Sequence, residues 1–300
     1  MMAEHPPRAP SRIARLALNV ADITRSAAFY EEALGFRVLA ASEAGPSERV
    51  ALLGGRFESL TLSLGAARLE LSRFLEGSTP YPARSLANDL WFQHFAVTCN
   101  DIDALADAVA RLGAEPITCG GPQKLPAASG GVTAYKFRDP DGHPLELLVP
   151  TGDAKDGIVT ESKADNTATI DHTAMSVADT GHAIAFYQEI LGLDIGGDQI
   201  NTGIEQDRLD GLSGTRVRVV SLRARAPGPH LELLGYERPR GRNGAWTPTD
   251  IAATRTVFEV ADLQALERRL EQAGAEIRRA ADAVLGHDPD GHWLLFEQKG

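Results

Sequence analysis

Three features are scarce in this chain, and each scarcity excludes a class of protein. Among 300 residues there are only two cysteines, Cys99 and Cys119, too few for a disulfide framework or a cysteine-based metal site. No apolar run approaches the roughly 18 residues of a membrane-spanning helix. The N-terminal segment MMAEHPPRAPSR lacks the apolar centre of a signal peptide. We therefore expect a protein of the reducing cytoplasm that does not act in a membrane.

Basic residues are also fewer than acidic ones. Lys and Arg number 30 against 41 Asp and Glu, which gives a net charge of −11. A protein with this balance and no basic stripe is not expected to bind nucleic acid or an anionic membrane surface. The chain is expected to act as a monomer or a homodimer. The 43% hydrophobic content is ordinary for a globular protein, and the length suggests about two domains.

A fourfold repeat organises the chain. Four segments share one pattern and each predicts a short strand that ends in Asp: RLALNVAD (15–22), HFAVTCND (94–101), HTAMSVAD (172–179) and RTVFEVAD (255–262). A stretch with apolar residues at three- and four-residue steps follows each Asp and predicts a helix, with the Asp as a suitable N-cap. Each helix is expected to stop at a glycine, at positions 35, 113, 192 and 274.

Three strand-like stretches follow each helix, compressed in the fourth repeat. The predicted fold is therefore α+β, with four strand–helix–three-strand (βαβββ) modules. Odd modules share FYEEALGF and FYQEILGL, while even modules share the DPDGH turn, so a pair of modules was duplicated. We expect an N-terminal domain at 13–150, a polar linker at 151–168 and a C-terminal domain at 169–298.

The DPDG turn feeds the last strand of each even module. Asp at the first position, Pro at the second and Gly at the fourth suit a type I turn. His143 and His292, which follow the two turns, are interpreted as structural residues flanking them. Further along these strands the two copies differ, because Glu146 of module two corresponds to Leu295 of module four.

The segments HTAMSVADTGHAIAFYQEILGL, HFAVTCNDIDALADAVARLGAE and KFRDPDGHPLELL resemble the vicinal oxygen chelate superfamily, in a fused two-domain form. This superfamily includes glyoxalase I, bleomycin resistance proteins and type I extradiol dioxygenases. The resemblance covers residues 13–149 and 169–298. It implies that modules pair into two cupped barrels, each able to surround a divalent metal. It also implies that a His of the first strand and a Glu of the last strand of each paired module supply the ligands.

The resemblance gives each module two candidate positions: Arg15 and Glu70, His94 and Glu146, His172 and Glu232, and Arg255 and Leu295. Pairing of sequence neighbours leaves both cavities incomplete. Pairing module two with three, and one with four, collects the complete set of two His and two Glu in one cavity. We prefer the second pairing, because a fused version of a swapped dimer would give it. In the other cavity, an ion pair of Arg15 and Arg255 with Glu70 is favoured over anion binding.

Two imidazoles and two carboxylates suit one divalent metal: Zn, Ni, Co, Mn or Fe(II). Four protein ligands leave two adjacent octahedral positions, which a substrate with vicinal oxygens can occupy. The metal would polarise a carbonyl and stabilise an enediolate. This favours an isomerase or lyase of glyoxalase type, for which the resemblance makes Glu146 the catalytic base.

Two alternatives stay open. One is an Fe(II)-dependent extradiol ring-cleaving dioxygenase, which needs three open metal positions, so Glu232 as a fourth ligand counts against it. The other is a metal-free resistance protein that binds a drug or metabolite, and the intact His and Glu count against it. Gln206, Arg208 and Lys124 are candidate substrate contacts on loops, where specificity is often determined. A solvent-exposed role suits each of them equally well.

Overall fold

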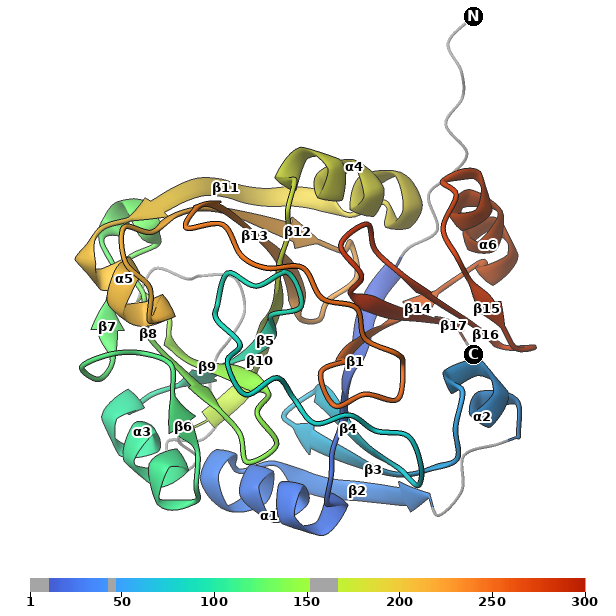
Figure 1. Cartoon of the computed structure of the whole chain (residues 1–300), viewed down its shortest axis with the longest axis horizontal. Coiled ribbons are helices and arrows are strands. Elements are labelled where there is room, and N and C mark those ends of the chain that lie inside the picture. The colour runs from blue at the N-terminus through green and yellow to red at the C-terminus, as the bar shows by residue number, and fades with distance from the viewer. Residues whose placement is uncertain (1–10, 43–46, 152–166, 300) are drawn as a thin grey trace, which may run out of the picture.

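The computed structural model describes residues 11–42, 47–151 and 167–299. Two large sheets with six α-helices form an α+β architecture, as predicted (Figure 1). The first half of the chain forms strands β1 (Ser11–Asn19), β2 (Arg37–Ser42), β3 (Phe57–Leu64), β4 (Ala67–Phe74), β5 (Gln93–Cys99), β6 (Glu115–Pro116), β7 (Gln123–Lys124), β8 (Thr133–Arg138) and β9 (Pro144–Val149). The second half forms β10 (Thr167–Ser176), β11 (Asp194–Thr202), β12 (Arg216–Arg223), β13 (His230–Arg238), β14 (Arg255–Val260), β15 (Arg278–Arg279), β16 (Ala283–His287) and β17 (Trp293–Gln298).

The strand order confirms the swapped pairing of the modules. Sheet A has eight strands in the order β15-β16-β17-β14-β1-β4-β3-β2, which joins module four to module one. Sheet B has nine strands and joins module three to module two, in the order β11-β12-β13-β10-β5-β9-β8-β6 with β7 beside β8. The junctions are antiparallel pairs between first strands, β1 with β14 and β10 with β5.

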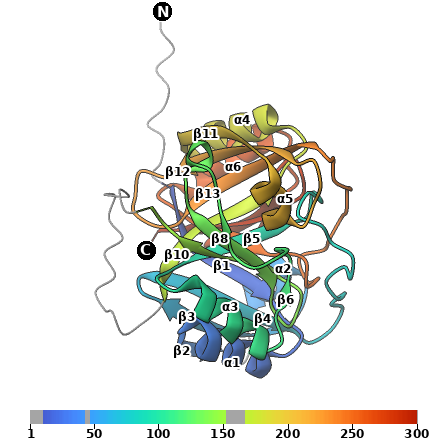
Figure 2. The ribbon, with the colours of Figure 1, turned by 90° about the vertical axis from the view of Figure 1, so that its left-hand side faces the viewer.

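The four predicted helices are α1 (Ile23–Leu34), α3 (Ile102–Arg111), α4 (Thr180–Leu191) and α6 (Leu263–Gln272). Each begins at the predicted Asp, whose side chain accepts backbone N–H groups of the first turn: Asp22, Asp101, Asp179 and Asp262. The helices pack on one face of the sheets, α1 against α3 and α4 against α6 (Figure 2). That face is apolar and forms the largest core cluster, so the opposite, inner face of each sheet is left for other side chains.

Two short helices depart from the predicted module. Helix α2 (Ser47–Leu53) in module one and α5 (Ile204–Asp210) in module three lie between the second and third strands. Each has only seven residues, too short for a clear helical period in the sequence. The predicted compression of module four is confirmed, since β15 has two residues and β16 has five.

None of the helices in the described ranges is long and apolar enough to cross a membrane. Most of the predicted linker, residues 152–166, lies outside the described part of the chain. The division into 13–150 and 169–298 stays a prediction about sequence organisation. Two contacts do link neighbouring modules, because the hydroxyl groups of Tyr30 and Tyr187 donate hydrogen bonds to Asp139 and Asp288.

The two DPDG turns form as predicted. The N–H groups of Gly142 and Gly291 donate to the carbonyls of Asp139 and Asp288, and both glycines have positive φ, 97° and 94°. At Gly142 a Cβ would lie 2.9 Å from the Cβ of Tyr81, so a side chain is excluded by space as well.

His143 is buried and structural, as interpreted from the sequence. Its Nδ1 lies 3.0 Å from a carboxylate oxygen of Asp139, and its Nε2 lies 3.1 Å from the carbonyl oxygen of Ile251. Both ring nitrogens therefore face acceptors, which favours the doubly protonated ring. Burial opposes this charge, but the Asp139 carboxylate outweighs it and raises the pKa of His143.

We predict that His143→Ala destabilises the protein more at about pH 6 than at about pH 9. A raised folded pKa contributes stability fully below the unfolded value of about 6.5, and that stability is lost as pH rises through the folded pKa. Urea unfolding of both proteins across this range measures the difference. His182→Ala, at an exposed position, is the control for the removal of an imidazole. An equal loss for His143→Ala at both pH values would contradict the prediction.

Candidate metal site

Two histidines meet on the inner face of sheet B because of the β5–β10 register. His94 lies opposite Ala174, and His172 lies opposite Ala96. The alternation of a strand then places both imidazoles on the side away from the helices. Their ring centroids are 5.6 Å apart, although they come from different halves of the chain.

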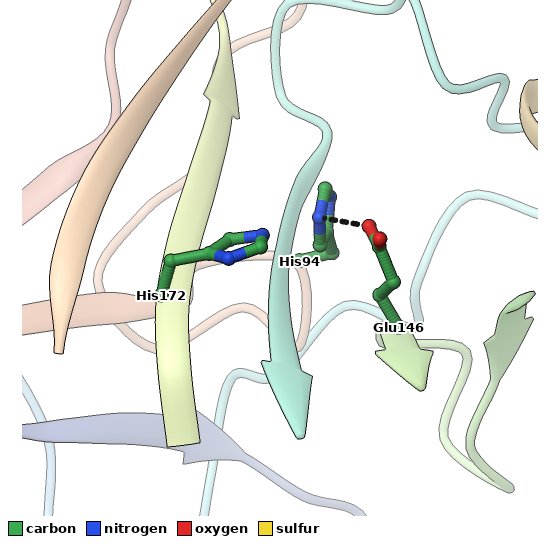
Figure 3. A group of neighbouring side chains, drawn as sticks. All are labelled: His94, Glu146 and His172. Carbon is green, nitrogen blue, oxygen red and sulfur yellow. Dashed lines mark ion pairs between the residues drawn. The ribbon is translucent and has the colours of Figure 1, made fainter. Parts of the chain in front are cut away.

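Glu146 completes a tight group of three. Strand β9 runs parallel to β5 with Glu146 opposite Ala96, so its carboxylate reaches the histidines. Its Oε2 lies 2.9 Å from Nε2 of His94, and ligand atoms of Glu146, His94 and His172 all lie within 4.8 Å of one another (Figure 3). All three side chains are at least nine-tenths buried.

The geometry around His94 fits a cation better than a hydrogen bond. Despite the 2.9 Å contact with Glu146, neither ring nitrogen of His94 has a hydrogen-bond partner among the described residues. Buried polar atoms are normally satisfied, so an unsatisfied pair of nitrogens requires an explanation. A buried histidine and carboxylate that lie 2.9 Å apart without hydrogen-bond geometry fit two ligands of one ion.

Glu232, the fourth predicted ligand, lies at the edge of this group. Its Oε2 is 3.7 Å from Nε2 of His172, and its Oε1 is 3.3 Å from Nε2 of His230. As the alternation of β13 predicted, His230 and Glu232 share a face, while Leu231 lies in the core. The described chain also brings Asp171, His172 and His230 together as a second group of potential ligands.

The pKa values of the two histidines are shifted in opposite directions. Burial, helped by the charge of Lys136, lowers the pKa of His94 to about 4, so His94 is neutral and can coordinate a metal. Burial also disfavours a charged His172, but Glu232 and Asp171 raise its pKa to about 9. Burial alone would raise the pKa of Glu232. The nearby His172 and His230 outweigh burial and lower this pKa to about 2.

Lys136, a buried lysine beside the group, was not among the residues predicted from the sequence. Its Nζ lies 2.7 Å from Asp210 and 3.9 Å from Glu146. Asp210 also accepts hydrogen bonds from Gln206 and Tyr236, so the pair is held in a polar network at the end of α5. A signal was present, because a charged residue between two aromatic residues of a strand, as in YKF, faces away from the core.

The three candidate substrate contacts lie in different environments. The Gln206 side chain is buried and donates to Asp210 2.7 Å away, so it belongs to the network around Lys136. Arg208 and Lys124 are exposed. A role in substrate binding stays a prediction for all three.

In sheet A, the positions that correspond to the candidate ligands have the same strand registers as in sheet B. Glu70 lies opposite Ala17 and Leu295 opposite Val257, as Glu232 lies opposite Ala174 and Glu146 opposite Ala96. The predicted Arg15–Glu70 ion pair is confirmed at 2.8 Å, and Arg15 also pairs with Glu297. The same prediction for Arg255 is wrong, because its hydrogen bonds go to uncharged acceptors.

Arg255 and Leu295 complete this inner face. Arg255 is fully buried and donates to Asn19, to the carbonyl of Pro248 and to Ser72. Leu295 packs in an apolar cluster with Val257 and Phe74. Both groups of potential metal ligands found in the described residues lie on sheet B.

Comparison with known proteins agrees with this geometry. The family model for the glyoxalase/bleomycin resistance protein/dioxygenase superfamily matches residues 12–147 and 169–296. The chain belongs to this superfamily. The two matched segments correspond to the two halves of the repeat.

Individual relatives are more distant. A lactoylglutathione lyase of Haemophilus influenzae is 32% identical over 132 residues, which cover 44% of this chain and 87% of that protein. A lactoylglutathione lyase of Arabidopsis thaliana is 25% identical over 193 residues, 64% of this chain but only 58% of the plant protein. Among solved structures, glyoxalase I from Zea mays has a TM-score of 0.66 at 17% identity and covers 97% of this chain and 93% of the maize chain, which shows a shared fold.

We predict that Lys136→Met destabilises the metal-free protein by about 3–5 kcal/mol, because it leaves the buried carboxylate of Asp210 without its cation. Urea unfolding of chelator-treated protein measures the loss. The double variant Lys136→Met with Asp210→Asn should recover part of it, since a neutral amide at position 210 leaves no charge to bury. A single variant as stable as the natural protein would contradict this account of the pair.

Proposed function

We propose that the chain is a divalent-metal-dependent enzyme of glyoxalase type, which moves a proton within a small substrate that has vicinal oxygens. The observation that carries the proposal is the buried group of His94, Glu146 and His172, whose ligand atoms lie within 4.8 Å of one another. The relatives named lactoylglutathione lyase support this reaction class over other activities of the fold. Fold alone would not select it.

His94, His172 and Glu146 would hold the metal, with Glu232 as a fourth ligand. The bound cation would supply a Lewis acid that polarises a substrate carbonyl. Two carboxylates balance the charge of a divalent cation, so filling the site leaves no uncompensated charge from these four groups. Zn, Ni, Co, Mn and Fe(II) all suit this donor set.

Glu146 is the proposed general base. Its carboxylate lies beside His94, and although burial would raise its pKa, Lys136 and His94 outweigh burial and lower it. It is therefore ionised at neutral pH and able to accept a proton from a C–H bond next to a carbonyl. Lys136, held by Asp210, keeps a positive charge 3.9 Å from the carboxylate and limits where Glu146 can move.

The direct test is thioester formation from methylglyoxal and glutathione by protein loaded with Zn²⁺, Ni²⁺ or Co²⁺. We predict activity that falls by about 10²–10⁴-fold in Glu146→Gln, because general base catalysis typically contributes that much. Glu70→Gln is the matched control, since Glu70 occupies the last strand of a module in sheet A. No thioester with any metal, or full activity of Glu146→Gln, would refute the proposal.

A second candidate has a specific observation in its favour. The tight group contains two His and one carboxylate, while Glu232 lies close to His230 at the edge. Two His and one carboxylate form the facial triad of non-haem Fe(II) oxygenases. Oxygen uptake by the Fe(II)-loaded protein with catechol or hydroquinone, in the absence of thioester formation, would replace the lyase with a ring-cleaving dioxygenase.

We also predict that binding of about one Zn²⁺ per chain releases about one proton at neutral pH. With a metal-free pKa of about 9, His172 carries a proton that Nε2 must lose before it binds the cation. Affinity should therefore rise about tenfold for each pH unit up to about pH 9. Calorimetry in buffers of different ionisation enthalpy counts the proton. Binding whose heat is independent of the buffer would contradict the prediction, and His172→Ala should abolish the release.

A further inference from the structure

Asp171 contacts His172, the candidate ligand that follows it in the sequence. Its Oδ2 lies 2.8 Å from Nδ1 of His172, and the contact has hydrogen-bond geometry. The side chain of Asp171 is 21% exposed and that of His172 is 6% exposed. This hydrogen bond occupies Nδ1 and leaves Nε2 as the nitrogen that faces the centre of the site, 3.7 Å from Glu232.

A β-bulge explains how two neighbours in sequence reach the same face. Along β10, Ile170 pairs with Val97 and His172 pairs with Ala96, so Asp171 is the extra residue without a cross-strand partner. Ile170 and Met175 lie in the helix-facing core, whereas Ala174 lies in an inner cluster. Strict alternation from Ile170 would turn His172 toward the helices, and the extra residue turns both Asp171 and His172 to the inner face.

His230 extends the contact to the other ligand of module three. Its Nδ1 lies 3.9 Å from Asp171, and its Nε2 lies 3.3 Å from Glu232. The rings of His230 and His172 are 5.2 Å apart, because the two residues lie opposite each other in the β10–β13 ladder. Asp171 and His230 therefore form a chain of contacts between the two candidate ligands of module three, His172 and Glu232.

Sheet A has the same bulge without the carboxylate. There Ile13 pairs with Phe258 and Arg15 pairs with Val257, so Ala14 is the extra residue of β1. Arg15 occupies the position of His172 and has carboxylate partners on other strands. The extra residue of the bulge is therefore an acid only in sheet B, where the next residue is a histidine. Because both sheets have the bulge, the acid is explained by the neighbouring histidine and not by the strand geometry.

We propose that Asp171 is a positioning residue that fixes the ring of His172 for metal binding through Nε2, with His230 holding Glu232 in the same way. The inference rests on the proposed metal site. A carboxylate on the outer nitrogen of a ligating histidine sets which nitrogen carries the proton and how the ring is oriented, and raises the basicity of the other nitrogen. Loss of such a partner typically weakens metal binding about 10–100-fold.

The first experiment uses metal-free protein and does not depend on the proposed function. Proton NMR should show a slowly exchanging, downfield imidazole proton on Nδ1 of His172, which disappears in Asp171→Ala. Asp198→Ala is the control, because Asp198 pairs with Arg218 on the outer strands of the same sheet. Absence of the signal in the natural protein, or its persistence in Asp171→Ala, would overturn the proposal.

The second experiment titrates the full-length protein with Co²⁺ alone, followed by visible absorption and by competition with a chromogenic chelator. Asp171→Asn should bind about 10–100-fold more weakly at unchanged stoichiometry, while Asp198→Asn should match the natural protein. Unchanged affinity in Asp171→Asn, or the loss of one bound Co²⁺, would refute a positioning role. A natural protein that binds no Co²⁺ would refute the proposed function, and the NMR result alone would then decide whether Asp171 positions His172.

Discussion

The antiparallel pairing of β5 with β10 is the constraint on which the candidate site depends. It joins modules from different halves of the chain and places His94 and His172 on one face at a ring separation of 5.6 Å. A one-residue slip in a strand register turns side chains to the opposite face, so the site tolerates little variation there. The parallel partners β9 and β13 then add Glu146 and Glu232 from the outer sides.

The same constraint acts in sheet A with the opposite chemical outcome. The β1–β14 junction places Arg15 and Arg255 where sheet B has histidines, and Leu295 where it has Glu146. Buried charges are tolerated when they are paired and hydrogen-bonded. Arg15 has two carboxylate partners and Arg255 has three hydrogen-bond acceptors, although its Nε has none among the described residues. In sheet B both ring nitrogens of His94 lack a hydrogen-bond partner among the described residues, a local cost typical of functional sites.

The features that could be predicted from the sequence are those that recur in the four modules. Four copies of one strand–helix pattern indicated the modules, and the family resemblance added the candidate ligand positions, whose distribution among the copies indicated the pairing. The sequence could not predict Asp171, because a bulge changes which residues share a face without leaving a mark in the hydrophobic pattern. Lys136 was missed because its partner Asp210 lies on α5, and a seven-residue helix from another module has no repeat signal.

The partner of Glu232 is what separates the two candidate reactions. When its carboxylate stays beside His230, the chain offers a cation two imidazoles and one carboxylate. Its other oxygen lies 3.7 Å from His172, and if it bound the same cation it would be a fourth ligand and leave one fewer position for substrate or oxygen. The β-sheet registers place His94, His172 and Glu146 on one face, so Glu232 at the edge of the group is the ligand on which the two reactions differ. In the proposed metal site, the choice between proton transfer and oxygenation would therefore depend on whether Glu232 joins the other ligands, and His230 lies 3.3 Å from its carboxylate.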